Sequence, residues 1–306
     1  MAEKIRLNGG FHNEVYYLKG ENRILRISDV HKTEKSILQE LEWMDFLQKH
    51  GVRVPLAEMK IRNYNGRIST FLEYIEGNPV EVTNQAFWNN KTFEKFGRIL
   101  GRMHALSKTY EVTEVYRPVW TKDKQDVFSI KSNLEPGMKR IYEDLIGKLL
   151  THPIAADTYG LIHNDFHQGN LIVSNQGDIV VIDFDECSYN WFAQDIAVFF
   201  YHAYWQQESF NGLTEDFCRE FLQSFFAGYQ AENLIHEVTI NQIPIFLKLR
   251  EIYLYQLFLH KWDLDQLEEW QKHTLNNLKD VIENQLPYAG IVDFSVYLQS
   301  WEEFLL

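Results

Sequence analysis

The hydrophobic pattern of this chain changes once, at residues 76–79. Before this point, apolar residues form short β-type runs at positions 15–18, 23–27 and 67–74, which are separated by turn residues. One helical pattern, at positions 33–49, lies between the second and the third run. The first part of the chain is therefore predicted to be a strand-rich unit of about 75 residues with one helix.

After residue 79 the pattern becomes mainly helical. A first helix is predicted at positions 93–106, where the apolar side chains fall on one face. Residues 115–140 contain prolines and a glycine, and we expect them to be irregular. Two short runs, 170–174 and 178–183, flank a turn signal and predict a single β-hairpin, and residues 192–306 read as helical and aromatic.

These two parts define the expected fold, which is α+β with two lobes. The predicted N-lobe covers residues 1–76, and the predicted helical C-lobe covers residues 77–306 and includes the hairpin. The chain has 306 residues, of which 45% are hydrophobic. This is enough apolar material for sizeable cores, so a disordered chain is excluded.

Composition and charge exclude several classes of function. No apolar stretch approaches the ~18 residues that a membrane helix needs, so we expect no membrane partner. The chain carries 30 Lys+Arg against 43 Asp+Glu, a formal net charge of −13, which argues against nucleic acid as a partner. The first residues lack the apolar region of a secretory signal, and the two cysteines, Cys187 and Cys218, are read as free buried thiols. A cytoplasmic location is therefore predicted.

Oxygen-bearing side chains gather around the predicted hairpin. Asp165 and Asn170 lie five residues apart in the loop before it, and Asp183 ends its second strand. Carboxylate and amide oxygens are ligands for hard cations such as Mg²⁺, and phosphoryl transfer needs such a cation together with a carboxylate that orients the attacking hydroxyl. A simple turn loop with a hairpin would account for one of these residues, but not for the ordered set.

The segment from His163 to Asn170, with the sequence His-Asn-Asp-Phe-His-Gln-Gly-Asn, and the following Ile-Asp-Phe-Asp at 182–185 resemble the catalytic and metal-binding loops of the protein-kinase-like superfamily. In this form they look like the aminoglycoside phosphotransferase / choline kinase family. The stretch Asp-Phe-Asp-Glu-Cys at 183–187 is similar to the branch that contains type II homoserine kinases. The resemblance extends from about residue 5 to about residue 260.

This resemblance implies a protein-kinase-like two-lobed fold, ATP or GTP as phosphoryl donor, and Mg²⁺. It implies that Asp165 is the catalytic base, that Asn170 and Asp183 hold Mg²⁺, and that His163 supports the loop. Asp195 matches a structural Asp of the family that braces the site. His167 is left open between a structural and a functional role.

The predicted N-lobe should then bind the nucleotide. Gly9 and Gly10 precede a strand, as a phosphate loop requires, although an ordinary hairpin turn would use them equally well. Arg26 stands where kinases place a phosphate-binding Lys, with Glu40 as its expected partner; a surface ion pair of little value is the alternative. Residues 71–77 resemble the hinge that reads the adenine through backbone groups, with Glu73 and Ile75 as nucleotide-binding candidates, or else form a plain strand.

Two departures from the protein-kinase pattern favour a small-molecule acceptor. Asp185 replaces the Gly of the protein-kinase motif, and there is no room for a long activation segment before Asp195. In the family the helical lobe forms the acceptor pocket, although aromatic residues at helical spacing are usually core. The substrate candidates are Asp185, Tyr201, Trp205, Arg250 and Tyr253. Arg250 lies in an apolar helix and needs an anionic partner, either a protein carboxylate or a group on the substrate.

The predicted function is transfer of the γ-phosphoryl group of ATP to a hydroxyl of a small metabolite or antibiotic-like alcohol. One alternative is a protein Ser/Thr kinase that uses the same residues. The other is a catalytically silent, nucleotide-binding pseudokinase, which the presence of Asp165, Asn170 and Asp183 opposes. The identity of the acceptor, the choice between ATP and GTP, and the oligomeric state are left open by the sequence.

Overall fold

The structure is a computed structural model, and it describes residues 3–7, 13–120, 134–214 and 216–298. The chain divides into two compact units. The first unit consists of Met1–Glu81, Thr109–Arg117 and Gln168–Cys187, and the second consists of Val82–Lys108, Pro118–His167 and Ser188–Leu306. The hairpin that we expected in the helical lobe is thus part of the first unit. The division into a nucleotide-binding N-lobe (1–76) and an acceptor-binding C-lobe (77–306) stays a prediction.

An antiparallel sheet of five strands dominates the first unit, in the order β1-β2-β3-β5-β4. Its strands are β1 (Lys4–Arg6), β2 (Glu14–Leu18), β3 (Arg23–Ile27), β4 (Arg62–Tyr64) and β5 (Arg67–Glu73). In the central strand β3, Arg26 pairs with Val15 on one side and with Thr70 on the other. Leu18, Leu25 and Ile27 form a small apolar core with Tyr16 and Phe71 packed against it. The β-type runs predicted from the sequence are therefore confirmed.

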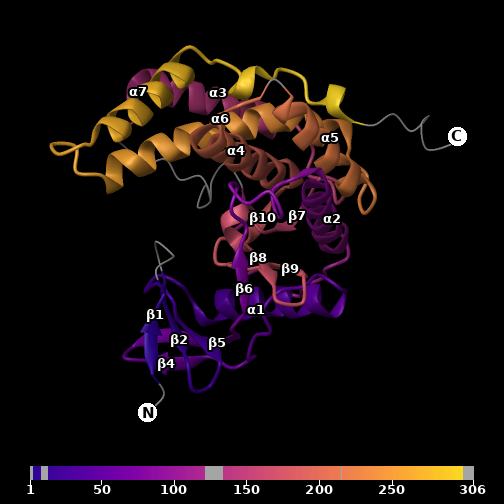
Figure 1. Cartoon of the computed structure of the whole chain (residues 1–306), viewed down its shortest axis with the longest axis vertical. Helices are drawn as coiled ribbons and strands as arrows, with labels where there is room; N and C mark the ends of the chain where they lie inside the picture. The colour runs from indigo at the N-terminus through magenta and orange to yellow at the C-terminus, as the bar shows by residue number, and fades with distance from the viewer. Residues whose placement is uncertain (1–2, 8–12, 121–133, 215, 299–306) are drawn as a thin grey trace, which may run out of the picture. The chain divides into compact units, whose positions relative to one another are not determined.

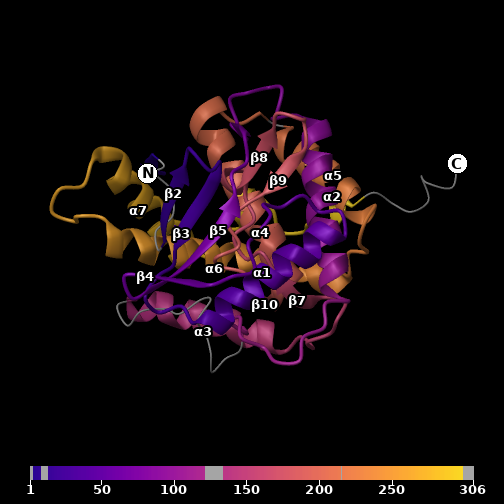
Figure 2. The same cartoon turned by 90° about the horizontal axis from the view of Figure 1, so that it is seen from below.

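Helix α1 (Glu34–Lys49) belongs to the same unit (Figures 1 and 2). The side chain of Thr33 caps its first turn by accepting a hydrogen bond from the N–H of Ser36. The predicted apolar spacing is observed, since the buried residues include Ile37, Leu41, Met44 and Leu47. Glu40 is fully buried on this helix, whereas Glu42 is exposed, as expected from their positions on the helix.

A second, three-stranded sheet completes the first unit, in the order β6-β8-β9. It consists of β6 (Gly77–Pro79) and the predicted hairpin, whose strands are β8 (Leu171–Ser174) and β9 (Ile179–Val181). A single 3₁₀ turn, Gln168–Asn170, leads into β8. The residues with site chemistry therefore sit at both ends of the hairpin, with Asn170 before β8 and Asp183 after β9.

The second unit is mainly helical (Figure 1). Its helices are α2 (Asn90–Ser107), α3 (Pro136–Leu150), α4 (Phe192–Asn211), α5 (Phe217–Gln230), α6 (Glu237–Lys261) and α7 (Glu269–Glu283). Short 3₁₀ turns follow at Tyr288–Gly290 and Ser295–Tyr297. A two-stranded antiparallel ladder joins β7 (Tyr159–Ile162) to β10 (Ser188–Trp191), so that the loop after β7 is brought next to the start of α4.

Three glycines let α2 and α5 pack backbone to backbone. A Cβ added to Gly97 would lie 1.9 Å from the carbonyl oxygen of Phe225, and one added to Gly228 would lie 1.9 Å from that of Glu94. Gly101 is similarly close to the backbone of α5. No larger residue fits at these positions without moving a helix, because the neighbouring atoms belong to backbone.

The expectation of irregular structure across residues 115–140 is wrong for its last five residues, and its middle part, 121–133, lies outside the described residues. Helix α3 begins at Pro136, which occupies the first turn, where a missing N–H costs nothing. The ladder of β7 and β10 was not predicted either. Cys187 is buried as expected, but Cys218 is only half-buried, and both are free. Among the described residues, no helix is long and apolar enough to cross a membrane.

Candidate active site

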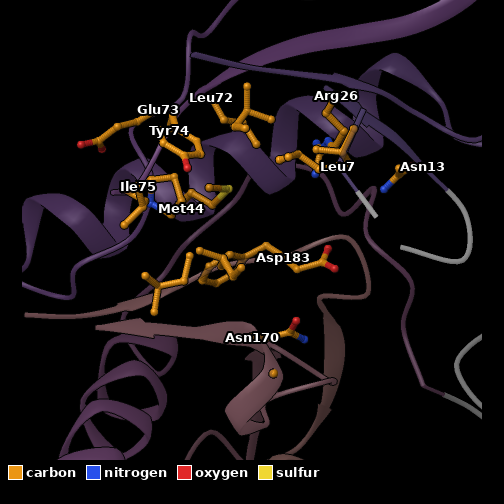
Figure 3. A pocket seen from close by; sticks show the side chains of 17 residues that line it. Leu7, Asn13, Arg26, Met44, Leu72, Glu73, Tyr74, Ile75, Asn170 and Asp183 are labelled. Carbon is orange, nitrogen blue, oxygen red and sulfur yellow. The ribbon is translucent and has the colours of Figure 1, made fainter. Parts of the chain in front are cut away.

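The first unit contains a cavity of about 350 Å³ between its two sheets and α1. Seventeen residues line it, and Figure 3 shows that Arg26, Asn170 and Asp183 all turn polar ends toward it. The rest of the lining is largely apolar, with Leu72 and Met44 among the side chains drawn. An apolar cavity with a few convergent polar groups is typical of a small-molecule site. Five of the site residues predicted from sequence therefore line one cavity, namely Arg26, Asn170 and Asp183 together with Glu73 and Ile75.

Asp183 and Asn170 provide two hard oxygen donors to this cavity. Asp183 has a φ of 63°, which is unusual for a residue with a side chain and is common at functional sites. Among the described residues, no group of three or more His, Cys, Asp or Glu side chains could hold a metal ion by itself. A carboxylate and an amide oxygen fit Mg²⁺ instead, since this ion keeps several waters and takes its remaining ligands from substrate phosphates.

Arg26 is 4% exposed and pairs with the fully buried Glu40, as the sequence predicted. Burial alone would lower the pKa of Arg26, but the carboxylate of Glu40 raises it, so the guanidinium stays charged. Two nitrogens of Arg26, Nε and Nη2, have no hydrogen-bond partner among the residues that the structure describes. A charged group that lines a cavity with nitrogens to spare is suited to bind phosphate oxygens.

The side chain of Glu73 is engaged within the protein. It forms a bidentate pair with Arg53, with distances of 2.8 and 3.1 Å, and accepts a 3.0 Å hydrogen bond from the N–H of Leu56. By contrast, no hydrogen bond is found between the backbone of Ile75 and any residue that the structure describes. Both residues line the cavity. Ile75 therefore offers backbone groups to a ligand, whereas the carboxylate of Glu73 fixes the end of the strand.

Gly9 and Gly10 lie outside the described residues. Their predicted contact with phosphate stays a prediction.

In the second unit, Asp195 holds the loop that contains Asp165. Its carboxylate accepts hydrogen bonds from the N–H groups of His163 (3.0 Å) and Asn164 (2.6 Å). His104 Nε2 lies 3.3 Å from the same carboxylate, and all these groups are buried. Asn164 has a φ of 69°, so the bonds from Asp195 hold a turn that a residue with a side chain seldom adopts.

Asp165 faces two basic side chains. Arg250 Nη2 lies 3.0 Å from its Oδ1, and His167 Nε2 lies 3.3 Å from its Oδ2. Burial alone would raise the pKa of the Asp165 carboxyl, but Arg250 and His167 lower it far below its usual value. The carboxylate is therefore ionised and oriented. The anionic partner that Arg250 requires in its apolar helix is therefore a protein carboxylate.

His202 is a residue that the sequence reasoning missed. Its Nε2 lies 2.7 Å from Arg250 Nη2, and its ring stacks on that of His167 with 4.5 Å between the ring centroids. Burial and the neighbouring Arg250 hold the pKa of His202 well below its ordinary value, so it is neutral and accepts a hydrogen bond from Arg250. Its place within an aromatic run, residues 199–205, gave it the appearance of a core residue.

The remaining substrate candidates have different surroundings. Tyr201 is buried and stacks on Tyr288, whereas Trp205 is 40% exposed. The ring centroid of Tyr253 lies 5.3 Å from Cζ of Arg250. Asp185 is buried in the first unit and pairs with Lys32 at 3.3 Å. It is not one of the residues that line the cavity. Contact of these residues with an acceptor stays a prediction.

The chain resembles known phosphotransferases over most of its length. Residues 4–235 match the phosphotransferase enzyme family. Amicoumacin kinase of Bacillus subtilis (strain 168) is 29% identical over 309 aligned positions, which cover 96% of this chain and 90% of that protein.

Solved structures give the same result for the fold. The structure of the amicoumacin kinase hAmiN in complex with AMP-PNP, Ca²⁺ and Ami has a TM-score of 0.84 and 27% identity, and the match covers 96% of this chain and 91% of that one. A microcompartment-associated aminopropanol kinase has a TM-score of 0.71 and 20% identity, with 95% and 94% covered. These matches confirm the α+β, kinase-like fold predicted from the sequence.

Proposed function

We propose, from the premise that the chain belongs to the phosphotransferase enzyme family, that it transfers the γ-phosphoryl group of ATP to a hydroxyl of amicoumacin or a related antibiotic alcohol. Membership in this family makes it an enzyme, a kinase of small molecules. The observation that carries the proposal is the cavity in which Arg26, Asn170 and Asp183 converge.

The nucleotide would occupy this cavity. Backbone groups of Ile75 would read the base, and Arg26, held by Glu40, would bind phosphate oxygens. Asp183 and Asn170 would hold Mg²⁺, which when bound neutralises charge on the phosphates. The volume of about 350 Å³ lies within the range of ordinary ligand pockets.

Asp165 would orient the hydroxyl of the acceptor and accept its proton. Phosphoryl transfer passes through a loose transition state, so a weakly basic carboxylate in a fixed position suffices for this role. Arg250 and His167 keep Asp165 ionised, and Asp195 holds the backbone of its loop. Arg250, His167 and Asp195 would therefore act on Asp165 alone, by keeping its carboxylate charged and its backbone in place.

The pairing of Arg250 with Asp165 bears on the acceptor. An acceptor that carries a carboxylate, such as homoserine, would be favoured if Arg250 were available to bind that group, but this guanidinium contacts Asp165 and His202. The similarity to amicoumacin kinases over 96% of the chain supports an acceptor of that kind. Amicoumacin is therefore the first compound to test.

The test is an assay of ADP release with ATP, Mg²⁺ and amicoumacin, in which mass spectrometry follows the gain of one phosphoryl group by the antibiotic. A phosphorylated antibiotic is the expected result. Phosphorylation of a protein substrate, with no small alcohol accepted, would favour the protein kinase. Nucleotide binding without any turnover across a library of alcohols would favour the pseudokinase.

A further inference from the structure

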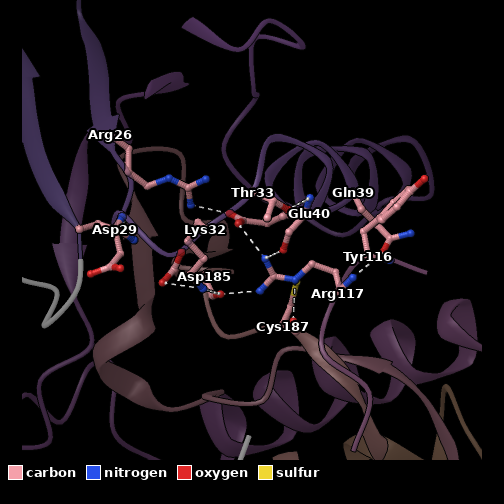
Figure 4. Close-up of polar contacts among 12 residues, drawn as sticks. Arg26, Asp29, Lys32, Thr33, Gln39, Glu40, Tyr116, Arg117, Asp185 and Cys187 are labelled. Carbon is pink, nitrogen blue, oxygen red and sulfur yellow. Dashed lines mark hydrogen bonds and ion pairs between the residues drawn. The ribbon is translucent and has the colours of Figure 1, made fainter. Parts of the chain in front are cut away.

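Arg117 is a buried arginine of the first unit that no part of the proposed function uses. It lies in Thr109–Arg117, a segment without helix or strand, and is 2% exposed. Its Nε donates a 2.8 Å hydrogen bond to the carbonyl of Cys187, and its Nη2 donates to the carbonyl of Asp185 (Figure 4). The guanidinium therefore binds the main chain two and four residues after Asp183.

The third nitrogen of the same guanidinium reaches α1. Nη1 lies 3.3 Å from Ser36 Oγ and 3.5 Å from Glu40 Oε2. The other oxygen of Glu40 pairs with Arg26. The buried carboxylate of Glu40 thus lies between two buried cations, Arg26 and Arg117. Arg117 in turn connects Glu40 to the main chain that follows Asp183 (Figure 4).

The segment that carries Arg117 is itself fixed to α1. Gln39 Oε1 accepts hydrogen bonds of 2.7 Å from the N–H groups of Tyr116 and Arg117, and its Nε2 donates to the carbonyl of Glu114 at 2.9 Å. The amide of Gln39 therefore sets the position of the backbone from which the guanidinium extends. Arg117 is thus held through its backbone by Gln39 and through its guanidinium by Glu40 and the two carbonyls.

Only a guanidinium satisfies this arrangement. A lysine would preserve the positive charge beside Glu40, but a single ammonium cannot reach two carbonyls and a carboxylate that lie in different directions. The carboxylate of Asp185 has its own ion-pair partner in Lys32, while Arg117 binds the carbonyl of this residue. Replacing Arg117 by Lys therefore separates the charge of the residue from its fixed geometry.

We propose that Arg117 is a positioning residue for phosphoryl transfer, which fixes the chain after Asp183 to the Glu40–Arg26 pair and so sets the metal ligand relative to the phosphate-binding cation. This inference rests on the proposed function, because it takes Asp183 as the metal ligand and Arg26 as the phosphate ligand. All the contacts that carry it lie within the first unit.

The test compares Arg117→Lys with a matched control, Arg67→Lys. Arg67 also binds two carbonyls and a carboxylate, those of Ser28 (3.0 Å), Ile27 (3.3 Å) and Glu14, but does not line the cavity. Calorimetry of the full chain measures the Kd of ATP with and without Mg²⁺. The ratio of the two constants is the readout, because a purely structural residue would not change it selectively.

In Arg117→Lys we expect the enhancement of ATP binding by Mg²⁺ to fall by about 10–100-fold, as is usual when a residue that orients a metal ligand is changed. Metal-free binding should change little, since the charge is kept. Arg67→Lys should keep the enhancement of the wild type. If Arg117→Lys also keeps the wild-type enhancement by Mg²⁺, the inference is wrong. It is also wrong if both variants lose the enhancement in proportion to a fall in Tm.

A second variant covers the case in which Arg117→Lys does not fold. Gln39→Ala frees the backbone at Arg117 and leaves the guanidinium intact, and it should also reduce the Mg²⁺ enhancement. An unchanged enhancement in that variant would overturn the inference. Failure of the proposed function itself gives a different result, in which the wild type shows no effect of Mg²⁺ on ATP binding at all.

Discussion

Arg250 donates a hydrogen bond of 3.0 Å to the carboxylate of Asp165, the residue assigned as the base. The two residues are 85 positions apart in the chain, and neutral His202 contacts the same nitrogen of Arg250. The pair keeps Asp165 ionised and fixes its direction, but it also makes the carboxylate a weaker base. A base of this kind suits a reaction in which orientation of the hydroxyl matters more than proton affinity.

Replacing Asp165 with Asn should lower kcat by about 10²–10⁴-fold or more, because a positioned base contributes in that range. Binding of ATP should be kept, since Asp165 does not line the nucleotide cavity. Steady-state kinetics and calorimetry measure these two effects. Asp157→Asn, at an exposed carboxylate of the same unit, is the control and should behave as wild type. Turnover close to wild type in Asp165→Asn would show that Asp165 is not the base.

Replacing Arg250 with Gln should change the pH dependence of kcat. In the wild type the pKa of Asp165 is far below its usual value, so the carboxylate stays ionised as the pH falls into the acidic range. Without Arg250, burial raises this pKa, and the base is lost by protonation at a higher pH. The acid limb of the kcat profile should therefore move upward by about 1–3 pH units. Arg250→Lys should restore most of the wild-type profile, and an unmoved acid limb in Arg250→Gln would contradict the account.

Asp183→Ala should abolish the enhancement of ATP binding by Mg²⁺, because the triphosphate then lacks its bridging cation. Asn170→Ala should have the same effect to a smaller degree, since it removes a neutral ligand. Titrations of ATP at several Mg²⁺ concentrations measure this. Asp178→Ala, at an exposed position of the same hairpin, is the control. A wild-type response to Mg²⁺ in Asp183→Ala would show that the metal ligand has been misassigned.

The single variants Arg26→Ala and Glu40→Ala should each weaken ATP binding. In the double variant, the loss of ATP-binding free energy should be smaller than the sum of the two single losses by about 0.5–3 kcal/mol, because the two residues form one buried unit. Glu40→Ala should also lower stability most, since it leaves Arg26 and Arg117 without their shared carboxylate. A double-mutant cycle from calorimetry and thermal unfolding gives both quantities. Additive losses in binding would make Arg26 an ordinary charged residue.

The sequence revealed those parts of the site whose chemistry is local. Asp165, Asn170 and Asp183 are recognisable because a short loop and a hairpin carry them at fixed spacing. The pair of Arg26 and Glu40 followed from a strand and a helical position, and the structure confirms the contact. These residues lie on short segments that are close together in the chain, so their spacing in the sequence predicts their positions in the structure.

Other features depend on distant segments and were hidden for that reason. The partner of Arg250 could not be chosen from the sequence, because many carboxylates were available. Arg117 lies in a segment read as irregular, and nothing local marks it as the link between α1 and the chain after Asp183. Pro136 by itself suggests an irregular region in the sequence, although proline also suits the first turn of a helix, where the structure places it.

Gly228→Ala tests a packing feature that sequence spacing alone did not reveal. A methyl group at this position of α5 would lie 1.9 Å from the carbonyl oxygen of Glu94 in α2, which is backbone and cannot rotate away. The free energy of unfolding should fall by about 1–3 kcal/mol or more, as is typical of overpacking. Gly147→Ala is the matched control, because Gly147 is exposed in α3 and a methyl group there meets nothing within 4 Å. That change should be neutral or stabilise by up to about 1 kcal/mol, since alanine favours helix. Chemical denaturation of both variants gives the comparison, and equal stability of the two would mean that α2 and α5 do not pack through their glycines.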